Sequence, residues 1–185
     1  MVRKFVIDTS VFLNPDSIKD FAKNAEEAII KFSELIKEMG ENVEVYIPSS
    51  IYKELTHFVN DISILSPYVR IRSPNLYSVY IPAAVIHSLI DDIRDRINKG
   101  LRIAEEYARL NNVKPEDIAK LRERYREALR AGIVDSKEDL ECLILAKEID
   151  ATLVSADEGM LNLAKMIGIE YMHPRAFFRF FQKNK

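Results

Sequence analysis

The chain has 185 residues, a length that favours one well-buried domain over two. Its 27 Lys and Arg residues against 29 Asp and Glu residues give a net charge of −2. This balance excludes a histone-like or tail-type nucleic-acid binder but leaves a local basic surface open. The single cysteine, Cys142, excludes an internal disulfide and a cysteine-based zinc site. No apolar run reaches the ~18 residues of a membrane span, and the apolar start is too short for a signal peptide, so we expect a cytoplasmic protein without membrane contact.

Short β-branched runs that alternate with helical periodicity predict the fold class. The expected strands are 4–7, 43–47, 151–156 and 169–172, and the expected helices are 18–39, 139–149 and one from Arg175 onward. Gly40 is expected to end the first of these helices. Strands that alternate with helices form a parallel sheet through right-handed crossovers. The sequence therefore predicts an α/β domain with a central parallel β-sheet flanked by helices.

Residues 87–131 interrupt this pattern, because they contain no strand signal and break once, before Pro115, which suits the first turn of a new helix. We therefore expect one domain over 1–185 with an inserted, protruding two-helix hairpin at about 87–131. Each helix carries a narrow apolar stripe at three- and four-residue steps, formed by Ile86, Ile90, Ile93, Ile97 and Ala104 on the first and by Ile118, Leu121, Tyr125 and Leu129 on the second. The stripes suit burial either against the partner helix or against another subunit.

Acidic residues follow the strands at the point where each strand ends. Asp8 follows the first strand, Glu54 lies early in the helix after the second, and Asp157 and Glu158 follow the third. Another group, Asp135, Asp139 and Glu141, surrounds the start of the helix before the third strand. Because the carboxyl ends of parallel strands meet at one edge of a sheet, we expect these acids to gather there.

Gathered carboxylates repel one another unless a cation neutralises them. An all-oxygen cluster without cysteine or adjacent histidine suits Mg²⁺ or Mn²⁺ rather than zinc. Such a site supports metal-dependent hydrolysis of a phosphate ester. A structural explanation competes for each acid taken alone, since Ser136 with Asp139 and Ser155 with Glu158 both match the capping box, and Asp8 is placed to cap a helix. Four acidic segments at one edge are much harder to explain by capping.

Three segments resemble the acidic motifs of PIN nuclease domains. They are Phe5–Leu13 with Asp8, Pro48–Leu55 with Glu54, and Leu153–Asp157 with a hydroxyl residue two positions before the acid. The stretch Val134–Glu141, the Asp157–Glu158 pair and the long hairpin extend the resemblance to almost the whole chain. That narrower match is similar to the small PIN-like, RNA-free ribonuclease P of the HARP type, a family formerly labelled RNA ligase partner protein.

The resemblance implies an endoribonuclease that removes the 5′ leader from precursor tRNA without an RNA subunit or a further protein partner. It implies Mg²⁺ or Mn²⁺ at the acidic edge, and homo-oligomers in which dimers build a larger ring or spiral through the hairpin. By position, the expected catalytic residues are Asp8, Asp135, Asp139 and Asp157. The expected metal ligands are these four together with Glu54, Glu141 and Glu158.

The hairpin concentrates the basic residues of the chain. Of its 13 arginines, 8 lie between positions 91 and 130. Arg122, Arg126 and Arg130 repeat every four residues and are the expected RNA-binding residues, because the planar guanidinium donates two hydrogen bonds to one phosphate. The alternative is a solvated helix stabilised by glutamate–arginine pairs, since Glu123 and Glu127 interleave with them.

Two other functions compete with leader removal. One is a toxin-like PIN ribonuclease that cuts mRNA or rRNA, against which the long hairpin argues. The other is a non-catalytic RNA-holding partner of another RNA enzyme. The intact set of acids argues against it, because clustered carboxylates serve no purpose in a scaffold.

Overall fold

The computed structural model describes residues 2–110, 112–130 and 136–182. Its strands are β1 (Arg3–Ile7), β2 (Val43–Ile47), β3 (Val69–Ile71), β4 (Thr152–Val154) and β5 (Tyr171–Met172). Its helices are α1 (Ser10–Leu13), α2 (Pro15–Ile18), α3 (Ala25–Met39), α4 (Ser49–Leu55), α5 (Ala83–Ala108), α6 (Pro115–Arg130), α7 (Lys137–Ile149), α8 (Glu158–Met166) and α9 (Pro174–Gln182). Short 3₁₀ turns lie at Gly40–Asn42 and Ser63–Leu65. No helix in the described part of the chain is both long and apolar enough to cross a membrane.

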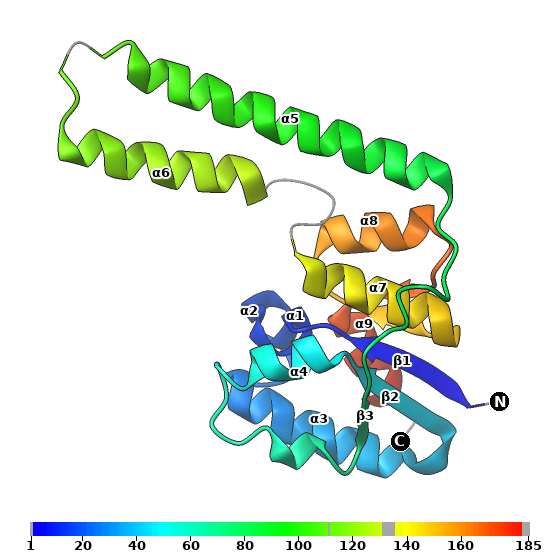
Figure 1. Cartoon of the computed structure of the whole chain (residues 1–185). Helices are drawn as coiled ribbons and strands as arrows, with labels where there is room; N and C mark the ends of the chain where they lie inside the picture. Colours follow the sequence, from blue (N-terminus) through cyan, green and yellow to red (C-terminus); the bar gives the residue numbers. More distant parts are fainter. Residues whose placement is uncertain (1, 111, 131–135, 183–185) are drawn as a thin grey trace. The chain divides into compact units, whose positions relative to one another are not determined.

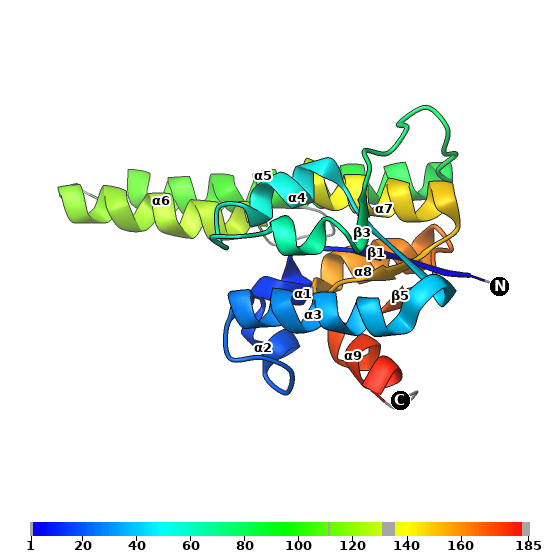
Figure 2. The ribbon, with the colours of Figure 1, turned by 90° about the horizontal axis from the view of Figure 1, so that it is seen from below.

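The five strands form one sheet in the order β3-β2-β1-β4-β5, and every pair is parallel. The predicted parallel sheet flanked by helices is thus confirmed, with α3 and α9 on one face and α7 and α8 on the other (Figures 1 and 2). Aromatic rings join β1 to the first of these faces, since Phe5 packs edge-to-face on Phe177 and Phe181 with centroids 5.2 and 5.5 Å apart. Parallel strands buried on both faces place all their carboxyl ends at a single edge.

Two details of the predicted elements were wrong. The helix expected at 18–39 begins only at Ala25, because the Asn24 side chain caps it by accepting a hydrogen bond from the Glu27 N–H at 2.9 Å. The edge strand β3 was not expected at all, since it has three residues and only Val69 among them is buried. Gly40 ends α3 as predicted, with a positive φ of 57° that glycine tolerates.

Residues 81–135 form a second compact unit, separate from the unit made of residues 1–80 and 136–185. Within it α5 and α6 run side by side (Figure 1). Gly100 allows their close approach, because a Cβ there would lie 2.6 Å from Cε2 of Tyr125. The buried Arg96 forms an ion pair with Asp92 at 2.6 Å and donates to the Leu129 carbonyl at 3.0 Å, which ties α5 to the end of α6. The protrusion of this pair from a single domain stays a prediction.

The two predicted apolar stripes differ in burial. The stripe on α5 faces outward from the helix pair, with exposed fractions of 46–57% at its four isoleucines and 55% at Leu101 one turn further on. On α6, Ile118 and Tyr125 are exposed, whereas Leu121 and Leu129 are half-buried. The α5 stripe therefore does not bury against α6.

Candidate active site at the carboxyl edge of the sheet

Asp8 lies at the end of β1 and is the most constrained of the predicted acids. Its side chain is 2% exposed. Oδ1 accepts from the Thr9 N–H at 2.6 Å, and Oδ2 accepts from the hydroxyls of Ser10 at 2.5 Å and Ser155 at 2.9 Å. Asp8 is not the N-cap of α1, a position that Thr9 occupies. A buried carboxylate that accepts this many hydrogen bonds is held in one orientation.

Two hydroxyl groups connect β1 to β4 at this edge. Ser10 Oγ accepts from the Ala156 N–H at 2.8 Å, and Ser155 Oγ accepts from the Asp157 N–H at 3.0 Å. Both hydroxyls also donate to Asp8, so the backbone before Asp157 is fixed relative to the Asp8 carboxylate. The capping box expected at Ser155 and Glu158 was wrong, because Asp157 itself caps α8 by accepting from the Met160 N–H at 2.7 Å.

The start of α7 brings further acids to the same edge. Ser136 caps α7 as predicted, by accepting from the Asp139 N–H at 3.0 Å. Glu141 accepts a hydrogen bond of 2.5 Å from the Ser50 hydroxyl in the first turn of α4. This contact places Glu141 beside α4.

Cys142 lies close enough to several of these acids for their charges to affect the pKa of its thiol. Cys142 is fully buried in α7. Burial raises the pKa of its thiol well above the usual value, and negative charges nearby raise it further. Those charges belong to Asp8, Asp139, Glu141 and Glu54. Four of the predicted acids, from the end of β1 and from α4 and α7, therefore lie within electrostatic range of one buried side chain.

Glu138 is an acid of this edge that the sequence analysis did not predict, and its effect is seen on the pKa of Glu54. Burial raises the pKa of Glu54, and the charges of Asp8 and Glu138 add to this, whereas His57 lowers it. Glu138 lies in the first turn of α7, next to the predicted Asp139. Glu138 acts on the pKa of Glu54 because α4 and α7 pack together. In the sequence, only its place in an acidic first turn of a helix pointed to it.

The remaining predicted residues are less closely joined to this cluster. Asp157 and Glu158 are exposed at the start of α8, and Asp157 is connected to Asp8 through the hydroxyl of Ser155. Asp135 lies outside the described residues. On α6, Arg122 and Arg126 are exposed, and Arg126 donates to the Arg122 carbonyl at 3.2 Å. The side chain of Arg130 also lies outside what the structure describes.

The donor chemistry of this edge fits a hard divalent cation. The Asp8 carboxylate is hydrogen-bonded to the hydroxyls of Ser10 and Ser155, and the one thiol nearby is kept protonated by burial and by its acidic neighbours. Among residues 2–110, 112–130 and 136–182, no three His, Cys, Asp or Glu side chains lie close enough together to hold a metal ion. The carboxylates of the described residues are thus gathered within electrostatic range, but not within coordination distance of one point.

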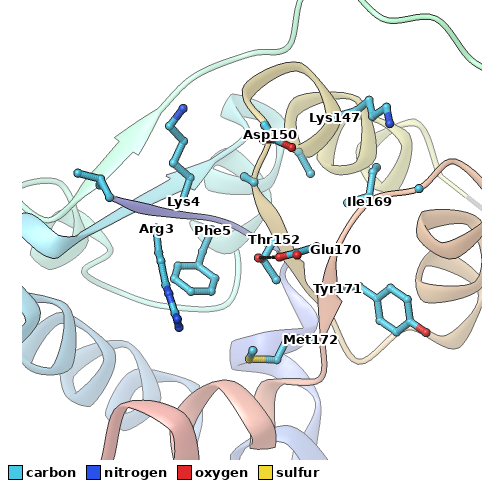
Figure 3. A pocket seen from close by; sticks show the side chains of 14 residues that line it. Arg3, Lys4, Phe5, Lys147, Asp150, Thr152, Ile169, Glu170, Tyr171 and Met172 are labelled. Atoms are coloured by element: carbon cyan, nitrogen blue, oxygen red, sulfur yellow. Dashed lines mark hydrogen bonds between the residues drawn. The ribbon is translucent and has the colours of Figure 1, made fainter. Parts of the chain in front are cut away.

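A cavity of about 930 Å³ opens at the opposite edge of the sheet, where β1, β4 and β5 begin (Figure 3). Two of its lysines are engaged with helix ends. Lys4 donates to the Ile149 carbonyl at 3.1 Å, and Lys147 donates to the Ile167 carbonyl at 3.0 Å. The cavity therefore lies a full strand length from Asp8, and its lysines have a structural explanation.

Comparison with known proteins identifies the family. The sequence matches the family described as PINc domain ribonuclease over residues 4–184. It is 44% identical over 180 residues to a protein of Thermodesulfovibrio yellowstonii named RNA-free ribonuclease P, covering 95% of this chain and 91% of that one. The chain belongs to the RNA-free ribonuclease P family.

Two further RNA-free ribonuclease P proteins agree with this. The protein of Thermococcus onnurineus is 45% identical over 181 residues, covering 94% of this chain and 91% of its own length. That of Halorhodospira halophila is 46% identical over 181 residues, covering 94% and 87%. The chain is thus an endoribonuclease with a PIN domain, and the resemblance seen in its acidic motifs is confirmed.

Proposed function

We propose that this protein removes the 5′ leader from precursor tRNA by divalent-metal-dependent hydrolysis, without an RNA subunit. The observation that carries the proposal is the 44–46% identity, over nearly the whole chain, to proteins named RNA-free ribonuclease P. The buried, multiply bonded Asp8 and the acids gathered around Cys142 support it, because they form an anionic site at the sheet edge where α/β proteins bind their ligands.

The residues proposed to hold the ion are the predicted acids. Asp8, Asp135, Asp139 and Asp157 are the proposed central ligands, and Glu54, Glu141 and Glu158 are proposed to contact the ion or its bound water. Mg²⁺ or Mn²⁺, when bound, supplies Lewis-acid stabilisation of charge on the phosphate. The chain's own contribution is orientation, since Ser10 and Ser155 fix the Asp8 carboxylate before an ion arrives.

We also propose that the helix pair serves assembly and substrate contact. The exposed stripe of α5 (Ile86, Ile90, Ile93, Ile97 and Leu101) is an apolar face about four turns long that suits the same face of a second copy. Dimers formed there are proposed to build the larger ring or spiral. Arg122 and Arg126 on α6 are proposed to hold tRNA phosphates away from the cut.

The test is cleavage of a precursor tRNA by purified protein in Mg²⁺, with the product ends mapped. A single cut at the mature 5′ end supports the proposal. Cleavage of unstructured mRNA or rRNA with equal efficiency would instead support the toxin-like alternative.

A further inference from the structure

A small cavity lies between α2 and α9, and none of the predicted metal ligands lines it. Figure 2 shows the two helices close together, and their residues are in contact. The cavity has a volume of about 220 Å³, and its lining consists of Ser17, Asp20, Phe21, Arg175, Phe178 and Arg179. We propose that it binds one backbone phosphate of the RNA substrate, an inference that rests on the proposed function.

The fold places this cavity beside the carboxyl edge of the sheet. Helix α2 follows Asp8 after only the short α1, and α9 begins two residues after β5 ends. In the sheet β5 and β1 are separated by β4 alone, which is a lateral offset of roughly 10 Å. Asp8 and Arg175 thus follow strands of the same sheet edge, and the proposal is that an RNA strand with one phosphate at Asp8 extends to Arg175.

Two arginines supply the donors. Arg175 and Arg179 are four residues apart on one face of α9. Arg175 is held by its Nε, which donates to the Asp16 carbonyl at 2.7 Å, while its Nη2 lies 3.4 Å from Oδ1 of Asp16. The side chain of Asp16 is 81% exposed, so a phosphate oxygen can replace its carboxylate at little cost. The ion pair of Arg179 with Asp20 is also exposed and longer, at 3.9 Å.

Ser17 supplies the observation that points to a ligand. Its side chain is 1% exposed, and its hydroxyl has no hydrogen-bond partner in the described part of the chain. Buried hydroxyls are almost always paired, because an unmade hydrogen bond in a dry site is costly. Phe21 and Phe178 stack with centroids 3.8 Å apart and keep α2 and α9 at a fixed separation. An acceptor that enters between the arginines completes the set of hydrogen bonds.

The charges around the cavity select the kind of phosphate. Asp16 and Asp20 offset the two guanidinium groups, so a lone inorganic phosphate gains little from binding there. A phosphodiester of an RNA that is already held elsewhere does not need a net positive site, since its entry is intramolecular. The cavity therefore fits a backbone phosphate of a bound RNA better than a free ion.

The test measures binding without cleavage. Fluorescence anisotropy of a labelled precursor tRNA is followed in EDTA over a range of KCl, with the full chain and its variants. Ser17→Ala removes only the buried hydroxyl and is expected to weaken binding about 5-fold, with the Tm kept or raised. Arg175→Ala is expected to weaken it about 10-fold and to reduce the salt slope by about one. Arg70→Ala removes an exposed ion pair with Glu44 at the β3 side of the sheet and is the matched control.

Wild-type affinity and salt slope in folded Ser17→Ala and Arg175→Ala would overturn the proposal. So would wild-type affinity in Arg175→Lys, which keeps the charge but loses the planar fork, or equal competition by millimolar inorganic phosphate. The proposed function is tested separately, in a cleavage assay of the wild-type protein with Mg²⁺. It fails if no product with the mature 5′ end appears.

Discussion

The Ser155 hydroxyl donates a hydrogen bond of 2.9 Å to Oδ2 of Asp8, and Ser155 Oγ in turn accepts one of 3.0 Å from the Asp157 N–H. One fully buried hydroxyl thus joins the acid at the end of β1 to the acid at the end of β4. Neither carboxylate needs to touch the other for their positions to be coupled. The site is organised by neutral donors as much as by its charges.

Ser155→Ala tests this coupling. The variant leaves Asp8 with one donor fewer and the Asp157 N–H without its acceptor, so we expect a stability cost of about 1–3 kcal/mol. The cleavage rate at low Mg²⁺ should fall about 10-fold and recover in part as Mg²⁺ is raised, because a bound ion would then orient the Asp8 carboxylate in place of the Ser155 hydroxyl. Ser33→Ala, which removes a buried hydroxyl bonded to the Ile30 carbonyl in α3, is the control and should cut like the wild type. An unchanged Mg²⁺ dependence in Ser155→Ala would refute the coupling.

Glu54→Gln tests the electrostatic crowding of the edge. Burial and the charges of Asp8 and Glu138 raise the pKa of Glu54 above its usual 4.5. A carboxyl whose pKa is raised on folding costs no stability below its unfolded pKa. The cost grows as pH rises above that value and is complete above the raised pKa. Glu54→Gln should therefore have a higher Tm than the wild type at pH 7 without metal, and the same Tm near pH 4. Equal Tm values at pH 7 would show that Glu54 bears no such cost.

Ile93→Glu tests assembly through α5. Ile93 is at the centre of the exposed apolar stripe, 46% exposed, so a charge there should leave the folded monomer intact and oppose burial of the stripe against another copy. Light scattering after size-exclusion chromatography should report a large assembly for the wild type and a much smaller species for the variant. Leu76→Glu, at an apolar and still more exposed position outside α5, is the control. The same mass for Ile93→Glu and the wild type would place the interface elsewhere.

Arg122→Ala tests substrate contact by α6. We expect it to raise KM for precursor tRNA about 10-fold with kcat nearly unchanged, because a remote phosphate contact binds ground and transition states alike. Arg124→Ala is the matched control, since Arg124 pairs with Glu106 at 2.6 Å and lies over the Tyr107 ring within the helix pair. If both variants raise KM equally, the effect reflects the charge of the helix rather than a contact at Arg122.

Features that extend over many residues could be predicted from the sequence, whereas features of a few residues could not. The parallel sheet and the gathering of acids could be predicted, because alternating strands and helices fix which ends of the strands meet. The edge strand β3 was missed because three residues, of which only Val69 is buried, carry almost no periodicity. The over-long first helix was a local error, since Asn24 is a recognisable cap.

The candidate site was harder to predict in its details. Glu138 and the contact of Glu141 with Ser50 depend on how α4 packs on α7, which no spacing within one helix reveals. The hydroxyls of Ser10 and Ser155 look like ordinary turn residues in the sequence, yet they hold Asp8. The two possible partners for the apolar stripe of α5 were equally compatible with its periodicity, and only the exposed fractions excluded α6.

The measurement that bears most directly on the proposed function is end-mapping of precursor tRNA after incubation with the purified protein and Mg²⁺. Asp139→Asn removes a charge from the acidic edge without touching the cap of α7, which uses the Asp139 N–H. Asp150→Asn is its matched control, at the other end of α7, in a left-handed conformation that asparagine tolerates. We predict one cut at the mature 5′ end by the wild type and by Asp150→Asn. The cleavage rate of Asp139→Asn should be lower by about 100-fold or more, and no cut should occur with EDTA. Undiminished cleavage by Asp139→Asn, or cleavage elsewhere in the transcript, would contradict the account.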